Sequence, residues 1–177
     1  MKCFNVGILG TGSIAQSMAF TLNALKDKGE VVPYAIASRS LKKAENFARE
    51  WHFEKAYSSY EALVSDPAVD LIYIATPHSL HYEHALLCLN HSKNTLVEKS
   101  FTANALQAQE LLSLAADKKV LLAEAIWTRY MPSRKIIADL LVSGAIGRFT
   151  TLNATFSVPI HEIPRMHDPS LCGGALL

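Results

Sequence analysis

The sequence lacks an excess of charge of either sign. Its 177 residues include 17 Lys and Arg against 16 Asp and Glu, a formal net charge of +1. Nucleic acids and anionic membranes recruit proteins through a bulk positive field, so we expect neither as a partner. Charged residues make up 19% of the chain and hydrophobic residues 50%. This balance excludes a disordered chain and allows a sizeable core.

Cysteine and long apolar runs are also scarce. Cys3, Cys88 and Cys172 lie far apart in the sequence, which argues against a disulfide framework or a zinc module. No apolar run approaches the roughly 20 residues that a membrane span needs. The N-terminus shows no signal-peptide pattern. We therefore expect a protein of the reducing cytoplasm.

Strand-like and helical patterns alternate along the first 124 residues. Runs rich in Val, Ile and Leu predict strands at 3–9, 31–37, 71–75, 95–97 and 120–123, and a weaker strand is predicted at 55–57. Apolar residues at helical spacing predict helices at 13–25, 41–51, 60–64, 81–90 and 103–117. Continuous apolar strands that alternate with helices are typical of a parallel sheet covered on both faces. We predict an α/β fold with a doubly wound parallel sheet.

The pattern changes after residue 124, and we place a domain boundary within 124–147. A helix is predicted at 132–142, and the alternating Thr- and Phe-rich stretch at 148–158 predicts a strand with one wet face. Residues 125–177 are then a connecting helix and the first strand of an incomplete C-terminal α+β domain, while residues 1–124 form a complete domain.

Glycine is rare, with eight residues, but it clusters in the run Gly10-Thr11-Gly12-Ser13-Ile14-Ala15. This G-x-G-x-x-A run follows a predicted strand and opens a predicted helix, the context of a dinucleotide-binding Rossmann fingerprint. Gly10 suits the tight turn, Gly12 lets the backbone approach a pyrophosphate, and the helix N-terminus supplies N–H groups. The alternative is a plain strand–helix turn that binds nothing.

The residues after the second predicted strand indicate whether the cofactor is NAD or NADP. An acidic residue there would bind the ribose 2′-hydroxyl of NAD, whereas a 2′-phosphate needs positive charge. The sequence has Ser38-Arg39-Ser40, with Lys43 one turn further on. Because the fork of Arg39 suits phosphate oxygens, Ser38, Arg39 and Lys43 predict NADP(H) rather than NAD(H). The alternative is that Arg39 and Lys43 only form a solvated face.

Three histidines, His78, His81 and His84, raise the question of a metal site. Zinc needs three or four converging ligands. On a helix, residues six apart diverge by about 120°, and no fourth ligand is spaced nearby except Glu83. We predict no metal site.

Four motifs in series resemble one known family. They are the runs Ala75-Thr76-Pro77-His78-Ser79-Leu80-His81, Glu98-Lys99-Ser100, Glu124-Ala125-Ile126-Trp127-Thr128-Arg129-Tyr130-Met131-Pro132 and Gly173-Gly174-Ala175-Leu176-Leu177. The series resembles the glucose–fructose oxidoreductase and inositol dehydrogenase (Gfo/Idh/MocA) family over the whole chain, and 124–132 most resembles its dimeric dihydrodiol dehydrogenase branch. The resemblance implies hydride transfer between a nicotinamide and a carbinol or carbonyl carbon of a sugar, polyol, dihydrodiol or dicarbonyl.

The same resemblance implies roles for single residues. The family's Thr-Pro-x-x-x-His loop lies along the cofactor, which assigns cofactor contacts to Thr76, Pro77, His78 and His81. Its Glu-Lys-Pro motif places a lysine beside the nicotinamide and the substrate hydroxyl, which makes Lys99 the catalytic residue, in a partly buried site. Glu98 would orient this lysine, and the alternative is a plain ion pair. Trp127 and Arg129 would line the cofactor cleft.

The sequence departs from the family at two places. Ser100 replaces a proline that is often cis, which leaves both a cis and a trans Lys99–Ser100 bond open. The family continues after Gly-Gly-Ala-Leu-Leu with the Tyr or His that exchanges a proton with substrate, and with a sheet that forms a homodimer. The chain stops before both. The alternative function is therefore a non-catalytic NADP-binding module or an inactive fragment.

Overall fold

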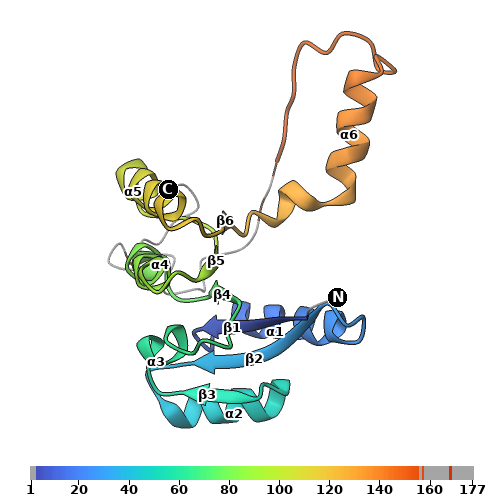
Figure 1. Cartoon of the computed structure of the whole chain (residues 1–177). Helices are drawn as coiled ribbons and strands as arrows, with labels where there is room; N and C mark the ends of the chain where they lie inside the picture. The colour runs from blue at the N-terminus through green and yellow to red at the C-terminus, as the bar shows by residue number, and fades with distance from the viewer. Residues whose placement is uncertain (1–2, 156, 158–167, 169–177) are drawn as a thin grey trace.

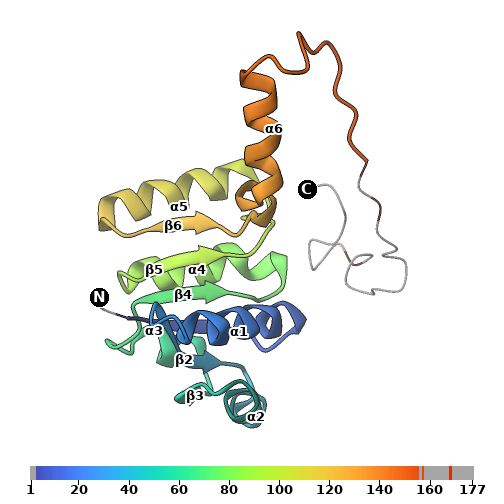
Figure 2. The same ribbon diagram turned by 90° about the vertical axis from the view of Figure 1, so that its right-hand side faces the viewer.

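The computed structural model describes residues 3–155, 157 and 168, and within them six strands form one parallel sheet (Figure 1). The strands are β1 (Phe4–Leu9), β2 (Val31–Ala37), β3 (Lys55–Tyr57), β4 (Leu71–Ile74), β5 (Asn94–Val97) and β6 (Leu122–Glu124). They pair side by side in the order β3-β2-β1-β4-β5-β6. Figure 2 shows β6, β5 and β4 stacked above β2 and β3. The predicted α/β class with a doubly wound parallel sheet is confirmed.

Helices cover both faces of this sheet. They are α1 (Ser13–Lys26), α2 (Leu41–Trp51), α3 (Tyr60–Val64), α4 (His81–Asn90) and α5 (Ala105–Lys118). Successive strand residues point to opposite faces, so Ile8 packs with apolar residues of α1 and α2 while Leu9 packs with those of α3, α4 and α5. Both side chains are fully buried. The continuous apolar strands thus serve two separate cores.

The strand order reverses between β1 and β4. The chain runs outward from β1 through β2 to β3, then returns to place β4 on the other side of β1. The loops that leave the carboxyl ends of β1 and β4 therefore turn in opposite directions. Open α/β sheets bind ligands in the crevice at this point.

Two boundaries differ from the predicted ones for local reasons. The helix predicted to begin at residue 103 begins at Ala105, because Asn104 caps its N-terminus. The Asn104 side chain accepts a hydrogen bond from the Gln107 N–H at 3.0 Å, and the Gln107 side chain accepts one from the Ala103 N–H at 3.1 Å. The strand predicted from residue 120 begins at Leu122, after Lys119 ends α5 with a φ of 56°.

Beyond β6 the chain leaves the sheet. A short 3₁₀ turn, η2 (Trp127–Tyr130), leads into α6 (Pro132–Val142), which confirms the predicted helix and stands apart from the sheet (Figure 1). The strand predicted at 148–158 is absent from residues 148–155 and 157, because no described strand lies beside them to share a hydrogen-bond ladder. The Gly173–Leu177 run lies outside the described residues. The division into 1–124 and 125–177 stays a prediction.

Among the described residues, no helix combines the length and the apolar character that crossing a bilayer would require.

Candidate cofactor-binding site

A cavity of about 560 Å³ lies along the carboxyl edge of the sheet, where the strand order reverses. This volume is within the usual range for cofactor sites. The loops after β1, β2, β4 and β5 and the first turns of α1, α2 and α3 form its walls. The lining residues are Gly10, Thr11, Gly12, Ser13, Ile14, Ser17, Ser38, Arg39, Ser40, Lys43, Tyr60, Ala75, Thr76, Pro77, His78, Glu98 and Lys99. The cavity thus collects most of the residues that the sequence singled out.

The two glycines of the β1–α1 turn meet different constraints. Gly10 has a φ of +102°, and a Cβ atom there would lie 2.9 Å from the carbonyl oxygen of Ala75. Only glycine fits this turn without strain. Gly12 has an ordinary φ of −80°, and a Cβ atom there would meet nothing within 4 Å. A ligand in the cavity can therefore approach the backbone at Gly12 closely.

Helix α1 begins directly at this turn. Within the described part of the chain no side chain caps its N-terminus, and its first turn contains no acidic residue. The leading N–H groups of a helix have no partner inside the helix and carry a partial positive charge. They are therefore available to an anion such as a pyrophosphate.

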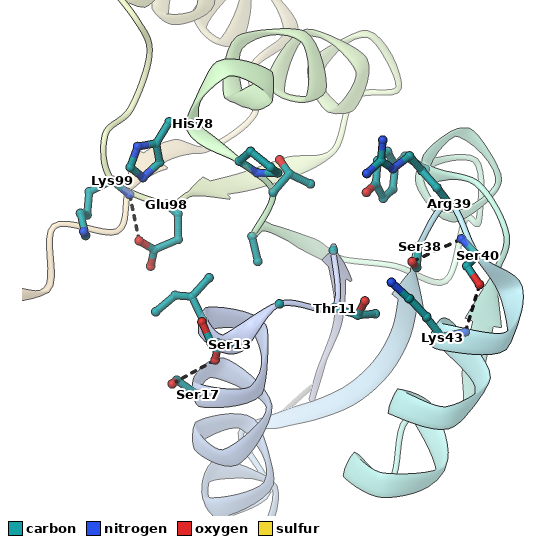
Figure 3. A pocket seen from close by; sticks show the side chains of 17 residues that line it. Thr11, Ser13, Ser17, Ser38, Arg39, Ser40, Lys43, His78, Glu98 and Lys99 are labelled. Atoms are coloured by element: carbon teal, nitrogen blue, oxygen red, sulfur yellow. Dashed lines mark hydrogen bonds between the residues drawn. The ribbon is translucent and has the colours of Figure 1, made fainter. Parts of the chain in front are cut away.

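Two cations stand at one end of the cavity. Arg39 follows β2, and Lys43 lies in the first turn of α2, where its N–H donates to the Ser40 hydroxyl at 3.5 Å. The Ser38 hydroxyl accepts from the Ser40 N–H at 3.4 Å. Both cations are exposed, and within the described residues neither is paired with a carboxylate. Figure 3 shows Arg39 and Lys43 facing the cavity from this end.

Sequence reasoning missed Tyr60, which reaches the same end from α3. Its ring packs edge-on against His84, with 4.6 Å between the ring centroids. Burial raises the pKa of Tyr60, and nearby Arg39 opposes the change, so the hydroxyl stays protonated at neutral pH. Tyr60 reaches the cavity through the crossover connection from β3 to β4, and no local sequence motif predicts this position. Ser17, Ser40 and Ala75 were missed as well, although each is adjacent to a predicted motif or one turn beyond it.

The loop after β4 forms the opposite wall. Thr76, Pro77 and His78 line the cavity, and His78 opens the 3₁₀ turn η1 (His78–Leu80). His81, predicted to contact the cofactor, is fully buried and does not line the cavity. Its Nδ1 faces the Ser100 carbonyl at 2.6 Å and its Nε2 faces the Thr76 carbonyl at 3.0 Å.

The histidine series does not converge on one point. His84 Nδ1 faces the Thr76 hydroxyl at 2.9 Å, while the ring nitrogens of His81 face backbone oxygens. Burial lowers the pKa of His84. No group of three side chains suited to a metal ion occurs among the described residues.

Lys99 stands at the end of the cavity away from Arg39, next to Glu98 and His78 (Figure 3). Its side chain is exposed, whereas we expected a partly buried one, because the cavity opens to solvent there. Glu98 is 8% exposed and accepts from the Tyr73 hydroxyl at 2.5 Å and from the Lys99 N–H at 3.1 Å. It therefore holds the backbone of Lys99, and no ion pair joins the two side chains in the described structure.

The Lys99–Ser100 peptide bond is cis, which decides between the two alternatives that the sequence left open.

Trp127 and Arg129 lie in η2 and do not line the cavity. The side chain of Trp127 is 55% exposed. Both residues follow the carboxyl end of β6, whereas the cavity is lined by the loops after β1, β2, β4 and β5.

The groups that line the cavity lie in an order that suits a dinucleotide. The glycine turn and the start of α1 lie in its middle, Arg39 and Lys43 at one end, and His78, Glu98 and Lys99 at the other (Figure 3). A pyrophosphate at the glycine turn would direct one nucleoside toward the cations and the other toward Lys99.

Comparisons with known proteins agree with this geometry. Residues 4–126 match the family GFO_IDH_MocA, described as an oxidoreductase family with an NAD-binding Rossmann fold. The chain is 42% identical over 171 residues to the trans-1,2-dihydrobenzene-1,2-diol dehydrogenase of Xenopus tropicalis. The aligned region covers 97% of this chain and 52% of that protein. The chain is 39% identical over 191 residues to the D-xylose 1-dehydrogenase (NADP(+)) of Hypocrea jecorina, covering 97% and 49%.

Solved structures show the same architecture. A 3-ketoreductase from Actinomadura kijaniata in complex with NADP is 32% identical, with a TM-score of 0.75 over 83% of this chain and 46% of that one. Levoglucosan dehydrogenase in complex with NADH and levoglucosan shares the fold, with a TM-score of 0.84 over 98% of this chain and 50% of that one.

The chain spans about half the length of the curated relatives it matches. The match to the family extends through the glycine turn, the loop after β4 and the Glu98–Lys99 segment. The chain therefore belongs to the Gfo/Idh/MocA family of oxidoreductases with an NAD-binding Rossmann fold.

Proposed function

We propose that this chain is the NADP(H)-binding part of an oxidoreductase that acts on a carbinol or carbonyl carbon. The observation that carries the proposal is the position of two cations, Arg39 and Lys43, at the end of the cavity beyond β2, where no carboxylate among the described residues forms an ion pair with them. A 2′-phosphate there would accept charge-assisted hydrogen bonds from both. The described residues place no carboxylate in the cavity wall at this end, where one would favour NAD.

The opposite end of the cavity supplies the groups for proton exchange. When bound, the nicotinamide supplies the hydride chemistry. Lys99 can donate a hydrogen bond to the substrate oxygen and exchange a proton with it, while Glu98 keeps the Lys99 backbone in place. Pro77 and His78 line the neighbouring wall. These groups suit reversible oxidation of an alcohol to a carbonyl.

We propose a sugar, polyol, dihydrodiol or dicarbonyl as substrate. The names of two relatives support this class, since proteins named for a dihydrodiol and for D-xylose are 42% and 39% identical to this chain. The cytoplasmic location and assembly as a homodimer through a C-terminal sheet remain proposals that the described residues leave untested.

Binding of the two cofactors tests the proposal. The purified chain is titrated with NADPH and with NADH, and the nicotinamide fluorescence is followed. We expect NADPH to bind at least about tenfold more tightly, since hydrogen bonds to charged groups contribute about 1.5–3 kcal/mol. Tighter binding of NADH would overturn the assignment of the cofactor.

Turnover separates the enzyme from a second candidate, a non-catalytic NADP-binding module, which the exposed position of Lys99 favours. NADP⁺ reduction is followed with a trans-dihydrodiol and with D-xylose, and NADPH oxidation with a dicarbonyl. Where turnover occurs, Lys99→Ala should lower kcat by about a hundredfold or more, since general acid–base groups contribute 10²–10⁴-fold. Lys118→Ala, on the exposed last turn of α5, is the control. Cofactor binding without turnover would support the module.

A further inference from the structure

The backbone around Lys99 is held by three ionisable side chains. The Lys99 N–H donates to Glu98 at 3.1 Å, and the Phe101 N–H donates to Glu124 at 3.1 Å. Between them, the Ser100 carbonyl faces Nδ1 of His81 at 2.6 Å. These partners come from the end of β5, from β6 and from α4, so three elements fix one short segment of backbone.

His81 also reaches the other wall of the cavity. Its Nε2 faces the Thr76 carbonyl at 3.0 Å, and its side chain is fully buried. Both partners are carbonyl oxygens, which only accept hydrogen bonds. A neutral imidazole has one N–H and one bare nitrogen, whereas the imidazolium has two N–H groups. Only the imidazolium satisfies both contacts, since the neutral ring would set a lone pair against a carbonyl oxygen.

A buried cation needs compensation, because burial without a partner costs several kcal/mol. Two carboxylates, Glu98 and Glu124, accept from the N–H groups on either side of Ser100. The other titratable rings nearby are His78 of η1, with 5.3 Å between the centroids, and His84 of α4. Burial lowers the pKa of His84.

We propose that His81 is a doubly protonated positioning residue that ties the loop after β4 to the segment carrying Lys99. The proposal rests on the proposed function, in which these two walls meet at the nicotinamide end of the cavity. Thr76 and Lys99 both line the cavity, while His81 lies behind them. The imidazolium fixes the spacing of the two walls, and with it the place of Lys99 relative to the cofactor.

Replacing His81 should lower the rate of the reaction more than the affinity for the cofactor. The hydrogen bonds of His81 in the described structure go to Thr76 and Ser100, not to the glycine turn or to the cations at the far end, so we expect phosphate binding to persist when His81 is replaced. The position of Lys99 does change, and a displacement of about 1 Å can cost about a hundredfold in rate.

The protonation state is tested directly by nuclear magnetic resonance on ¹⁵N-labelled wild-type chain at pH 7. We expect both ring nitrogens of His81 to show a directly bonded hydrogen, visible because the buried ring exchanges slowly. A His81 nitrogen without a bonded hydrogen would overturn the proposal. This measurement needs neither turnover nor a variant that folds.

The positioning role is tested with His81→Phe, which keeps a flat ring and removes both donors. His91→Gln, at the exposed C-terminal end of the same helix, is the matched control. In His81→Phe we expect the amide resonances of Lys99 and Phe101 to shift and kcat to fall about a hundredfold, while the Kd of NADPH stays close to wild type. Unchanged amide resonances and kcat in folded His81→Phe would overturn the role. Failure of the proposed function would show differently, as wild-type chain that binds no NADPH although both His81 N–H groups are present.

Discussion

Alanine at Gly10 should lower stability, whereas alanine at Gly12 should leave stability nearly unchanged and weaken cofactor binding. At Gly10 the φ of +102° costs about 1–3 kcal/mol for any other residue. The added Cβ would also lie 2.9 Å from the Ala75 carbonyl oxygen, which is backbone at the end of β4, and overpacking of this kind costs about 1–3 kcal/mol more. The free energy of unfolding of Gly10→Ala should therefore fall by at least about 2 kcal/mol, which lowers Tm by about 4 °C or more.

Gly12→Ala should leave stability within about 1 kcal/mol of wild type, because φ is −80° and the Cβ meets no atom within 4 Å. The same Cβ would occupy the surface that we propose for the pyrophosphate. We expect the Kd of NADPH to rise at least about tenfold, which corresponds to about 1.4 kcal/mol.

Urea unfolding and NADPH fluorescence measure the two effects. Gly29→Ala is the control for Gly10→Ala, because Gly29 has a φ of +72° and no atom within 4 Å of its Cβ position. The difference between these two variants isolates the clash with Ala75. Wild-type NADPH affinity in Gly12→Ala would refute the placement of the pyrophosphate, and wild-type stability in Gly10→Ala would refute the geometry of the turn.

Two further substitutions test contacts outside the phosphate-binding turn. Tyr73→Phe should destabilise the chain by about 1–3 kcal/mol in urea unfolding, because the carboxylate of Glu98 loses its 2.5 Å hydrogen bond inside the protein; an unchanged midpoint would count against that bond. Burial alone would raise the pKa of Asp66, but hydrogen bonds from Lys55 and Tyr57 overcome it and hold the pKa well below its usual range. The stability that Asp66 contributes is therefore present at neutral pH and lost as the pH falls below about 4. The urea midpoint of wild type should drop more steeply from pH 7 to pH 3 than the midpoint of Asp66→Asn. Parallel pH curves for the two proteins would contradict this.

The sheet was predictable because most of its strands have a local signal in the sequence. Apart from β3, whose residues are Lys-Ala-Tyr, each strand lies in a short run that contains Val, Ile or Leu between helical patterns, and buried parallel strands need this composition. The strand at 148–158 was predicted by the same kind of signal, and residues 148–155 form none. An alternating pattern indicates only that a segment suits a sheet, whereas a strand forms where a neighbour offers a hydrogen-bond ladder.

The candidate site was predictable where its residues follow strands directly, as Gly10, Arg39 and Lys99 do. Tyr60 was missed because it reaches the cavity through a crossover of the chain, not through a motif. His81 was placed in the cavity by resemblance, yet it lies behind the wall. Spacing along the sequence indicates that a residue is near a site, but which face of α4 turns inward depends on packing against the sheet.

The central claim is that Arg39 and Lys43 select NADP(H). The most direct test is the ratio of the Kd for NADH to the Kd for NADPH in wild type, Arg39→Ala, Lys43→Ala and Lys42→Ala, the last an exposed neighbour outside the cavity wall. We predict a ratio of at least about ten in wild type and in Lys42→Ala, and a fall toward one in the other two variants through weaker NADPH binding alone. A wild-type ratio near or below one, or equal losses of both cofactors in Arg39→Ala, would contradict it.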